Sequence, residues 1–390
     1  MPIEGRDDGA ASSPIRLGMV GGGEGAFIGA VHRMAARLDG HYHLVAGALS
    51  STPEKSRRSG EALALDPKRI YDDFATMARR EARLKDGIEA VSIVTPNHMH
   101  APAAAAFLKA GIHVICDKPL TTTLKEARKL KALADQSGLI FAVTHNYTGY
   151  PMVRHAREMV RSGELGDIRV IHVEYPQDWL TEPIEKSGQK QADWRTDPQR
   201  SGAGGCVGDI GTHAYNLADF IFGVPVTELC ADLTTFVPGR KLDDNVQILL
   251  RYENGARGML WASQVAPGNE NNLKIRIYGT KGGIEWRQEH PNQLSYTPFG
   301  KPTQIISRGT GAANASAARV TRIPAGHPEG YLEGFATIYS EVAEAIRAAR
   351  QGRQPDNAVN FPTIDDGVKG VAFIEAAVKS SAKGATWVRL

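Results

Sequence analysis

The sequence predicts an α/β protein with two domains: an N-terminal doubly wound domain and a C-terminal α+β domain with a large open, mostly antiparallel sheet. Three observations lead to this prediction. Short apolar runs alternate with helical segments up to about residue 145, and the first run leads straight into a glycine-rich turn. From Thr227 to about Phe299, strand patterns follow one another without helices between them, which is typical of antiparallel sheets.

The N-terminal domain is expected to span residues 15–145, after a flexible tail at residues 1–14. Its five apolar runs lie at residues 15–20, 44–49, 90–95, 113–117 and 140–144. Helical spacing at residues 102–110 and 124–136 ends close to Gly111 and Gly138, as helices commonly do. Short apolar strands that alternate with helices predict a parallel sheet covered on both faces.

The C-terminal domain is expected to span residues 146–390 and to bind substrate and form the contacts between subunits. A helix at residues 151–161 and a strand at 168–175 precede a long irregular stretch at 177–208. Asn254-Gly255 between two strand patterns is a strong hairpin signal. Two further helices are expected at residues 331–349 and 364–382.

Composition excludes several classes of protein. Among 390 residues, Lys and Arg number 46 and Asp and Glu 43, so the small positive surplus gives no case for nucleic acid or an anionic membrane. No run approaches the ~20 apolar residues of a membrane helix, and the N-terminus has no export signal. The three cysteines are widely spaced and form no disulfide or metal pattern, so we expect a cytoplasmic protein.

The glycine-rich turn after the first strand matches a dinucleotide fingerprint. Gly21-x-Gly23-x-x-Ala26 fits G-x-G-x-x-G/A, in which glycine lets backbone N–H groups approach a pyrophosphate at a helix N-terminus. Such a motif alone can be purely structural, but here it closes the first strand of an alternating pattern. The turn therefore predicts a Rossmann domain that binds NAD or NADP.

The end of the second strand leaves the choice of cofactor open. NAD usually meets an acidic residue there, whereas this chain has Ser50 and Ser51. Lys55, Arg57 or Arg58 would suit a 2′-phosphate or be solvated charges on a helix. We favour NAD.

Two segments carry candidate catalytic groups. Asp117-Lys118-Pro119 ends the fourth strand, and Asp209 and His213 stand four apart, on one face of an expected helix. Taken singly, each is more often a turn or a surface pair than a site. Asp209 and His213 also resemble a metal pair, but a third ligand at suitable spacing is missing, so we expect no metal.

The joint order of these motifs resembles the Gfo/Idh/MocA oxidoreductase family over nearly the whole chain from Ile15. The family's marks are the glycine turn, Thr95-Pro-Asn-His-Met-His100, Asp117-Lys118-Pro119, Trp194-Arg195 and the segment that ends at His213. The chain departs from the family at Asp117, which is usually Glu, and at Asn216, where an acid is common. Tyr175-Pro-Gln-Asp-Trp179 is similar to levoglucosan dehydrogenases.

The resemblance implies roles for individual residues. His213 would be the base, Asp209 would orient His213 or the substrate, and Lys118 would stabilise the developing alkoxide. The expected substrate-binding residues are Lys118, Tyr147, Trp179, Asp209, His213 and His327. The expected cofactor-binding residues are Gly21, Gly23, Ala26, Phe27, Ile28, Ser50, Ser51, Thr95, Pro96, Asn97, His100, Asp117, Lys118, Asn146, Trp194 and Arg195.

The resemblance implies an NAD(P)-dependent dehydrogenase that oxidises a ring hydroxyl of a sugar, sugar derivative or cyclitol. Two alternatives stay open: a glycosidase that oxidises its substrate transiently, and a non-catalytic NAD-binding regulator. A homodimer or homotetramer through the C-terminal sheet is also expected. Apolar residues lie on both faces of its strands, as the adjacent Ile248, Leu249 and Leu250 show.

Overall fold

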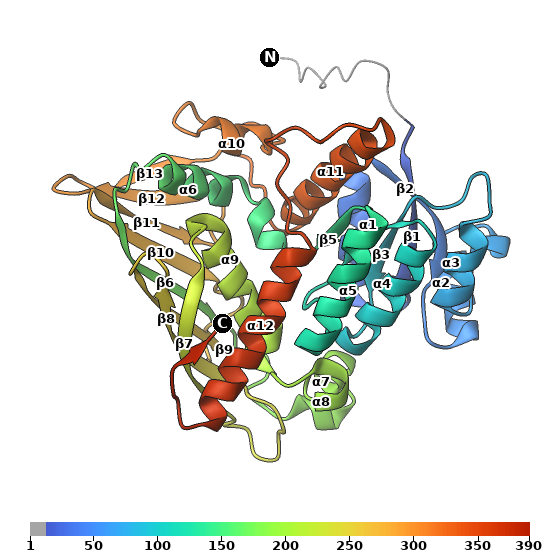
Figure 1. Ribbon diagram of the computed structural model, residues 1–390, viewed down its shortest axis with the longest axis horizontal. Helices are drawn as coiled ribbons and strands as arrows, with labels where there is room; N and C mark the ends of the chain where they lie inside the picture. Colours follow the sequence, from blue (N-terminus) through green and yellow to red (C-terminus); the bar gives the residue numbers. More distant parts are fainter. Residues whose placement is uncertain (1–12) are drawn as a thin grey trace.

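The computed structural model describes residues 13–390, which form two sheets joined by shared helices (Figure 1). The tail predicted at residues 1–14 lies almost wholly outside the described residues. Across the described part of the chain, no helix has both the length and the apolarity needed to cross a membrane.

The first sheet is parallel, with strand order β2-β1-β3-β4-β5. Its strands are β1 (Ile15–Gly21), β2 (Tyr42–Ala48), β3 (Ala90–Val94), β4 (His113–Cys116) and β5 (Phe141–Val143). The intervening helices are α1 (Phe27–Leu38), α2 (Pro53–Ala62), α3 (Phe74–Glu81), α4 (His100–Lys109) and α5 (Leu124–Ser137). This arrangement confirms the predicted doubly wound fold, and it places the strand ends of β1 and β3 at the switch point where such sheets bind ligands.

The second sheet has nine strands in the order β13-β12-β11-β10-β6-β9-β8-β7-β14. They are β6 (Ile168–Pro176), β7 (Val226–Thr234), β8 (Asn245–Tyr252), β9 (Arg257–Ser263), β10 (Lys274–Gly279), β11 (Gly282–Arg287), β12 (Gln293–Pro298), β13 (Gln304–Ser307) and β14 (Val388–Arg389). Among the described strands of this sheet, β6 and β9 alone pair in parallel; β9 lies between β6 and β8 and pairs antiparallel with β8. The predicted large, mostly antiparallel sheet is confirmed.

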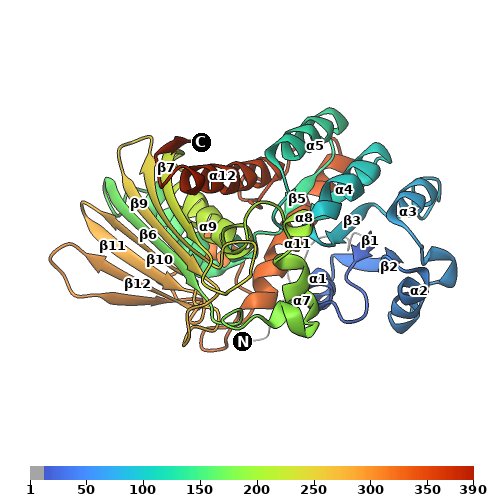
Figure 2. The ribbon, with the colours of Figure 1, turned by 90° about the horizontal axis from the view of Figure 1, so that it is seen from below.

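One face of this sheet is covered and the other is open. α6 (Pro151–Arg161), α9 (Thr212–Phe222) and α12 (Ile364–Ala382) pack on the covered face, as Figures 1 and 2 show. The stretch at 177–208, predicted to be irregular, contains the short helices α7 (Lys190–Arg195) and α8 (Pro198–Ser201). Another short helix, α10 (Ala315–Arg319), precedes the long helix α11 (Tyr331–Arg350).

α11 comes late in the chain but packs against the first sheet. Its apolar residues share a core cluster with Ile15 and Leu17 of β1. The Tyr339 hydroxyl also lies 2.7 Å from Ser92 Oγ on β3 and 2.8 Å from His32 Nδ1 on α1. The predicted domain boundary at residue 145 stays a prediction, since the last two helices contact elements of both halves.

Candidate active site

The glycine turn after β1 has a backbone that side chains would obstruct. Gly21 and Gly22 have φ values of +78° and +71°, a region that L-residues rarely adopt. The Gly23 N–H donates to the carbonyl oxygen of Leu49 at 3.1 Å, and a Cβ on Gly23 would lie 2.6 Å from that oxygen. Glycine is therefore required at these positions by the turn itself.

The closest approach between this turn and α1 occurs at Gly29, which the sequence analysis missed. A Cβ on Gly29 would lie 2.3 Å from Gly22 Cα, so the helix can reach the turn only without a side chain there. The sequence analysis gave the third fingerprint position to Ala26, which instead precedes α1 as its N-cap residue. Phe27, the first residue of α1, is 66% exposed, and Ile28 is half-buried.

Replacing Gly29 by alanine is expected to weaken NADH binding about tenfold or more, because overpacking strain of ~1–3 kcal/mol falls on the turn that the sequence predicts to bind the cofactor. Fluorescence titration with NADH measures the effect. Gly311→Ala is the matched control, since a Cβ at Gly311 meets nothing within 4 Å. Equal NADH affinity for both variants would contradict the role assigned to this turn.

The end of β2 presents hydroxyls rather than a carboxylate. Ser50 and Ser51 precede α2, and the Thr52 N–H donates to Ser50 Oγ at 3.3 Å. Arg58 pairs with Glu24 at 3.3 Å on an exposed surface, where such a pair contributes little. These donors fit ribose hydroxyls, and the absence of an acid among residues 49–52 leaves room for a 2′-phosphate.

The turn after β3 is tied to the turn after β4. Thr95 and Pro96 form it, and the fully buried His100 lies 2.9 Å from the Thr95 carbonyl oxygen and 2.8 Å from that of Pro119. Asn97 donates to the Ser201 carbonyl oxygen at 2.9 Å, which joins this turn to α8. Both polar side chains hold the strand ends in place, and their predicted contacts with a cofactor stay predictions.

Lys118 follows β4 and reaches across to the other half of the molecule. Asp117 Oδ1 accepts hydrogen bonds at 2.9 Å from the Lys118 N–H and from Thr144 Oγ1, which fixes the start of this turn. Lys118 Nζ donates to Asp209 Oδ1 at 2.9 Å and to the Asp209 carbonyl oxygen at 2.6 Å. The ammonium group thus bridges two segments 91 residues apart.

Asp209 lies in a π-helical turn, Val207–Gly211, that leads into α9. Its other oxygen, Oδ2, accepts from Arg195 Nε at 3.2 Å and from Gln264 Nε2 at 2.9 Å. Burial by itself would raise the pKa of this carboxyl, but Lys118 and Arg195 hold that pKa well below its usual range. Asp209 is therefore an anion whose two oxygens are both occupied. Gln264 was not predicted from the sequence. Trp194, which was predicted, packs against Arg195, whose Cζ lies 4.3 Å from the centroid of the Trp194 ring.

His213 lies one helical turn further on and is 8% exposed. Its ring meets those of Tyr147 at 4.9 Å and His145 at 5.6 Å between centroids. Burial, followed by the charge of Lys118, lowers the pKa of His213 well below the ordinary value of 6.5. The imidazole is therefore neutral at neutral pH and able to accept a proton. Among the described residues no hydrogen bond joins Asp209 to His213. The predicted role of Asp209, to orient His213 or the substrate, stays a prediction.

Five buried polar atoms at this place lack a hydrogen-bond partner among the described residues. They are Thr95 Oγ1, His145 Nδ1, Asn146 Nδ2, Thr212 Oγ1 and His213 Nδ1. Each unsatisfied buried group costs about 1–3 kcal/mol, so such groups rarely gather without a ligand or water to satisfy them. This concentration of unpaired polar atoms singles out the surroundings of His213 as a candidate binding site.

Two further residues lie away from this cluster. His327 is exposed, and no contact among residues 13–390 joins its ring to Lys118, Asp209 or His213; its predicted role stays a prediction. Asn216 lines a cavity of about 470 Å³ whose lining residues include none of those three. The described residues contain no group of three His, Cys, Asp or Glu side chains that could hold a metal ion.

Two family models match the chain. Residues 15–145 match the oxidoreductase family with an NAD-binding Rossmann fold, and residues 153–285 match the GFO/IDH/MocA C-terminal domain. The first match spans the whole parallel sheet, and the second spans the nine-stranded sheet from β6 into β11.

Solved structures and a curated protein are similar over nearly the whole chain. An oxidoreductase from Sinorhizobium meliloti is 58% identical, with a TM-score of 0.89 and coverage of 97% of this chain and 100% of that chain. An inositol dehydrogenase homolog from Azotobacter vinelandii, complexed with NAD⁺, is 40% identical, with a TM-score of 0.93 and coverage of 97% and 98%. The corresponding structure with NADH and myo-inositol has a TM-score of 0.91. The levoglucosan dehydrogenase of Pseudarthrobacter phenanthrenivorans is 29% identical over 96% of this chain and 97% of that protein.

Proposed function

The chain belongs to the GFO/IDH/MocA family of NAD-binding oxidoreductases, and we propose that it oxidises a ring hydroxyl of a sugar, sugar derivative or cyclitol. The observation that carries the proposal is the contact of Lys118, at the end of β4, with Asp209, beside the neutral ring of His213. It brings a cation and a base together at the edge of the sheet where the glycine turn lies.

Each residue of this centre has a distinct task. Asp209 occupies two of the three N–H donors of Lys118, so the third donor is free for the substrate hydroxyl. As that hydroxyl loses its proton, the fixed cation stabilises the developing alkoxide. A ring nitrogen of His213 takes the proton. The bound nicotinamide supplies the hydride acceptor.

The cofactor is proposed to be NAD, as in the Azotobacter vinelandii complex. The backbone N–H groups of the glycine turn would hold the pyrophosphate, and Ser50 and Ser51 would bond the ribose. Asn146, whose amide nitrogen is buried without a partner, would meet the nicotinamide. We expect NADP⁺ to be accepted less well, because Arg58, a cation that follows β2, is paired with Glu24.

The test is reduction of NAD⁺ and NADP⁺ with a panel that contains myo-inositol, levoglucosan, free hexoses and aryl glycosides. A dehydrogenase accumulates NADH in proportion to the sugar oxidised. Cleavage of glycosides without NADH accumulation would indicate the glycosidase, and NAD binding without turnover of any compound would indicate the regulator. Either outcome would overturn the proposal.

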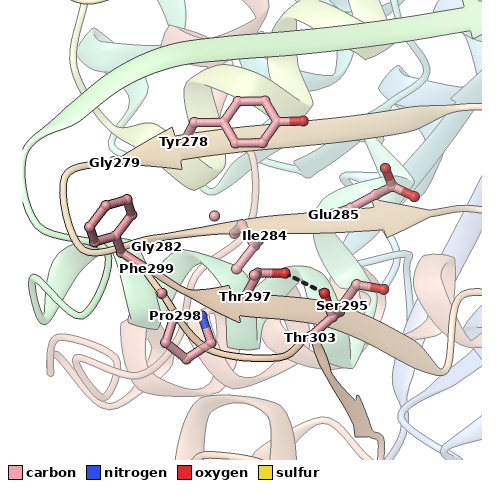
Figure 3. A pocket seen from close by; sticks show the side chains of 12 residues that line it. Tyr278, Gly279, Gly282, Ile284, Glu285, Ser295, Thr297, Pro298, Phe299 and Thr303 are labelled. Carbon is pink, nitrogen blue, oxygen red and sulfur yellow. Dashed lines mark hydrogen bonds between the residues drawn. The ribbon is translucent and has the colours of Figure 1, made fainter.

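The open face of the second sheet supports a homo-oligomer. Ile248 and Leu250 are buried against the helices, whereas Leu249 between them points outward and is 51% exposed. Near the hairpins of β10–β12, Tyr278 and Phe299 flank a hollow of about 570 Å³ (Figure 3). Apolar surface of this kind commonly marks a subunit contact.

We expect light scattering at micromolar concentration to give a dimer or tetramer of the 42.1 kDa chain. Leu249→Lys should shift the mass toward the monomer, because it places a charge on the open face. Lys241→Ala, at an exposed position in the loop between β7 and β8, is the control. A monomer mass for the unaltered protein would contradict an assembly through this sheet.

A further inference from the structure

A chain of hydrogen bonds leads from Trp179 to Tyr147. Trp179 Nε1 donates to Gln177 Oε1 at 3.0 Å, and Gln177 Nε2 donates to Asn271 Oδ1 at 2.6 Å. Tyr175 donates to the same Asn271 oxygen at 2.7 Å, and its hydroxyl lies 2.5 Å from that of Tyr147. The members come from the end of β6, the loop after it, the loop before β10 and the turn after β5, and they meet only in the fold.

The direction of every bond in this chain is determined by chemistry. An indole nitrogen can only donate, so Gln177 must present its oxygen to Trp179 and its NH₂ group to Asn271. Asn271 must then present its oxygen, which also receives the Tyr175 hydroxyl proton. Since that proton is used, the Tyr175 oxygen can only accept from Tyr147.

The hydroxyl oxygen of Tyr147 can therefore only accept a further hydrogen bond, because its one proton is already donated. Burial raises the pKa of both tyrosines, so each phenol keeps its proton at neutral pH. The single proton of Tyr147 is committed to Tyr175, while its ring packs edge-on against His213. A group that meets the Tyr147 oxygen must bring a hydrogen of its own.

We propose that Asn271 is a specificity-determining residue, which acts through Tyr175 and Tyr147 to require a hydrogen-bond donor on the substrate beside the reacting carbon. The inference rests on the proposed function and deepens it. It selects polyols with a free hydroxyl next to the one that is oxidised, and it rejects analogues in which an ether, a ketone or fluorine takes that place. Asn271 is a positioning residue, since it touches the substrate only through the two tyrosines.

The expected discrimination is large. Sites built to bond a substrate hydroxyl reject analogues without it by ~10⁴–10⁵, because the protein group is left unpaired. Tyr147 is buried, and losing one hydrogen bond there should give a discrimination of at least about 10². Without an acceptor at Asn271, Tyr175 is free to turn and Tyr147 becomes able to donate, so much of this discrimination should disappear.

The experiment compares myo-inositol with its monodeoxy-monofluoro derivatives, because fluorine is close to hydroxyl in size and cannot donate. We expect Asn271→Leu to reduce the ratio of kcat/KM between myo-inositol and the most strongly rejected derivative by about tenfold or more. Asn271→Asp, whose carboxylate still accepts from both donors, should keep the ratio within about threefold. Fluorine's electronic effect is the same for all variants and cancels in the comparison.

Asn272→Leu is the matched control, because the Asn272 side chain bonds Asn269 and not the tyrosines. Faster hydrogen exchange at the Trp179 indole N–H in Asn271→Leu, but not in Asn272→Leu, would confirm that the series of hydrogen bonds from Trp179 to Tyr147 is broken. An unchanged selectivity ratio in Asn271→Leu, with an active wild-type enzyme, would overturn this inference alone. A wild-type enzyme that neither binds nor oxidises any polyol would overturn the proposed function, and the inference with it.

Discussion

Replacing Lys118 by alanine is expected to lower kcat by ~10²–10³, the usual cost of losing one group that stabilises a developing oxyanion. The Kd for NADH should change only a few-fold, since we propose that the glycine turn after β1, and not the ammonium, holds the pyrophosphate. A second effect follows from electrostatics. Lys118 lowers the pKa of His213, so its loss should raise that pKa and move the acid limb of kcat/KM to higher pH.

The measurements are kcat, the pH profile and NADH affinity, with Lys129→Ala as the matched control. Lys129 is an exposed lysine on α5, remote from Asp209. Near-full kcat in Lys118→Ala would show that the catalytic centre is assigned wrongly, although the dinucleotide site would still stand.

Replacing His213 by alanine is expected to lower kcat by ~10²–10⁴, the usual contribution of a positioned general base. The wild-type profile follows from the direction of the pKa shift. Because the pKa of His213 lies well below 6.5, the imidazole stays neutral down to acid pH, so kcat/KM should be level around neutrality and fall only at acid pH. In the variant, hydroxide should partly replace the base, so activity should rise with pH.

His43→Ala is the control, because His43 is an exposed histidine on β2. Combining Lys118→Ala with His213→Ala should cost less than the product of the single effects, as for residues that act on one reacting group. If the loss of kcat in the double variant equals the product of the two single losses, the two side chains act independently. That result would contradict a shared catalytic centre.

Much of the fold could be predicted because the burial of a strand or helix determines the pattern of apolar residues along its sequence. The five apolar runs of the first half became β1–β5, since a strand covered on both faces is apolar throughout. Adjacent Ile248, Leu249 and Leu250 likewise showed a strand with one buried and one open face. The order of the strands leaves no such trace: the parallel pair of β6 and β9 joins segments more than 80 residues apart, and no local pattern marks it.

The site could be predicted only for reactive side chains that also lie in segments resembling family motifs. The Lys118–Asp209 contact spans 91 residues, and it was expected because both segments resemble family motifs. Gln264 and Asn271 were missed because amides in loops have no period, charge or reactivity that distinguishes them. Gly29 carried a signal that was overlooked, since glycine in the first turn of a helix is costly unless something approaches closely. His327 was singled out for its chemistry, yet its side chain lies exposed.

The packing of α11 on the first sheet has a consequence for biosynthesis. One face of β1 is covered by residues 331–350, which leave the ribosome some two hundred residues after β5. At ~5–20 residues per second, the nascent sheet waits on the order of ten seconds or more with its Ile15 and Leu17 side uncovered. A fragment that ends near residue 145 should therefore aggregate unless the α11 segment is supplied in trans, and the emerging chain is a natural client for a chaperone that shields apolar strands.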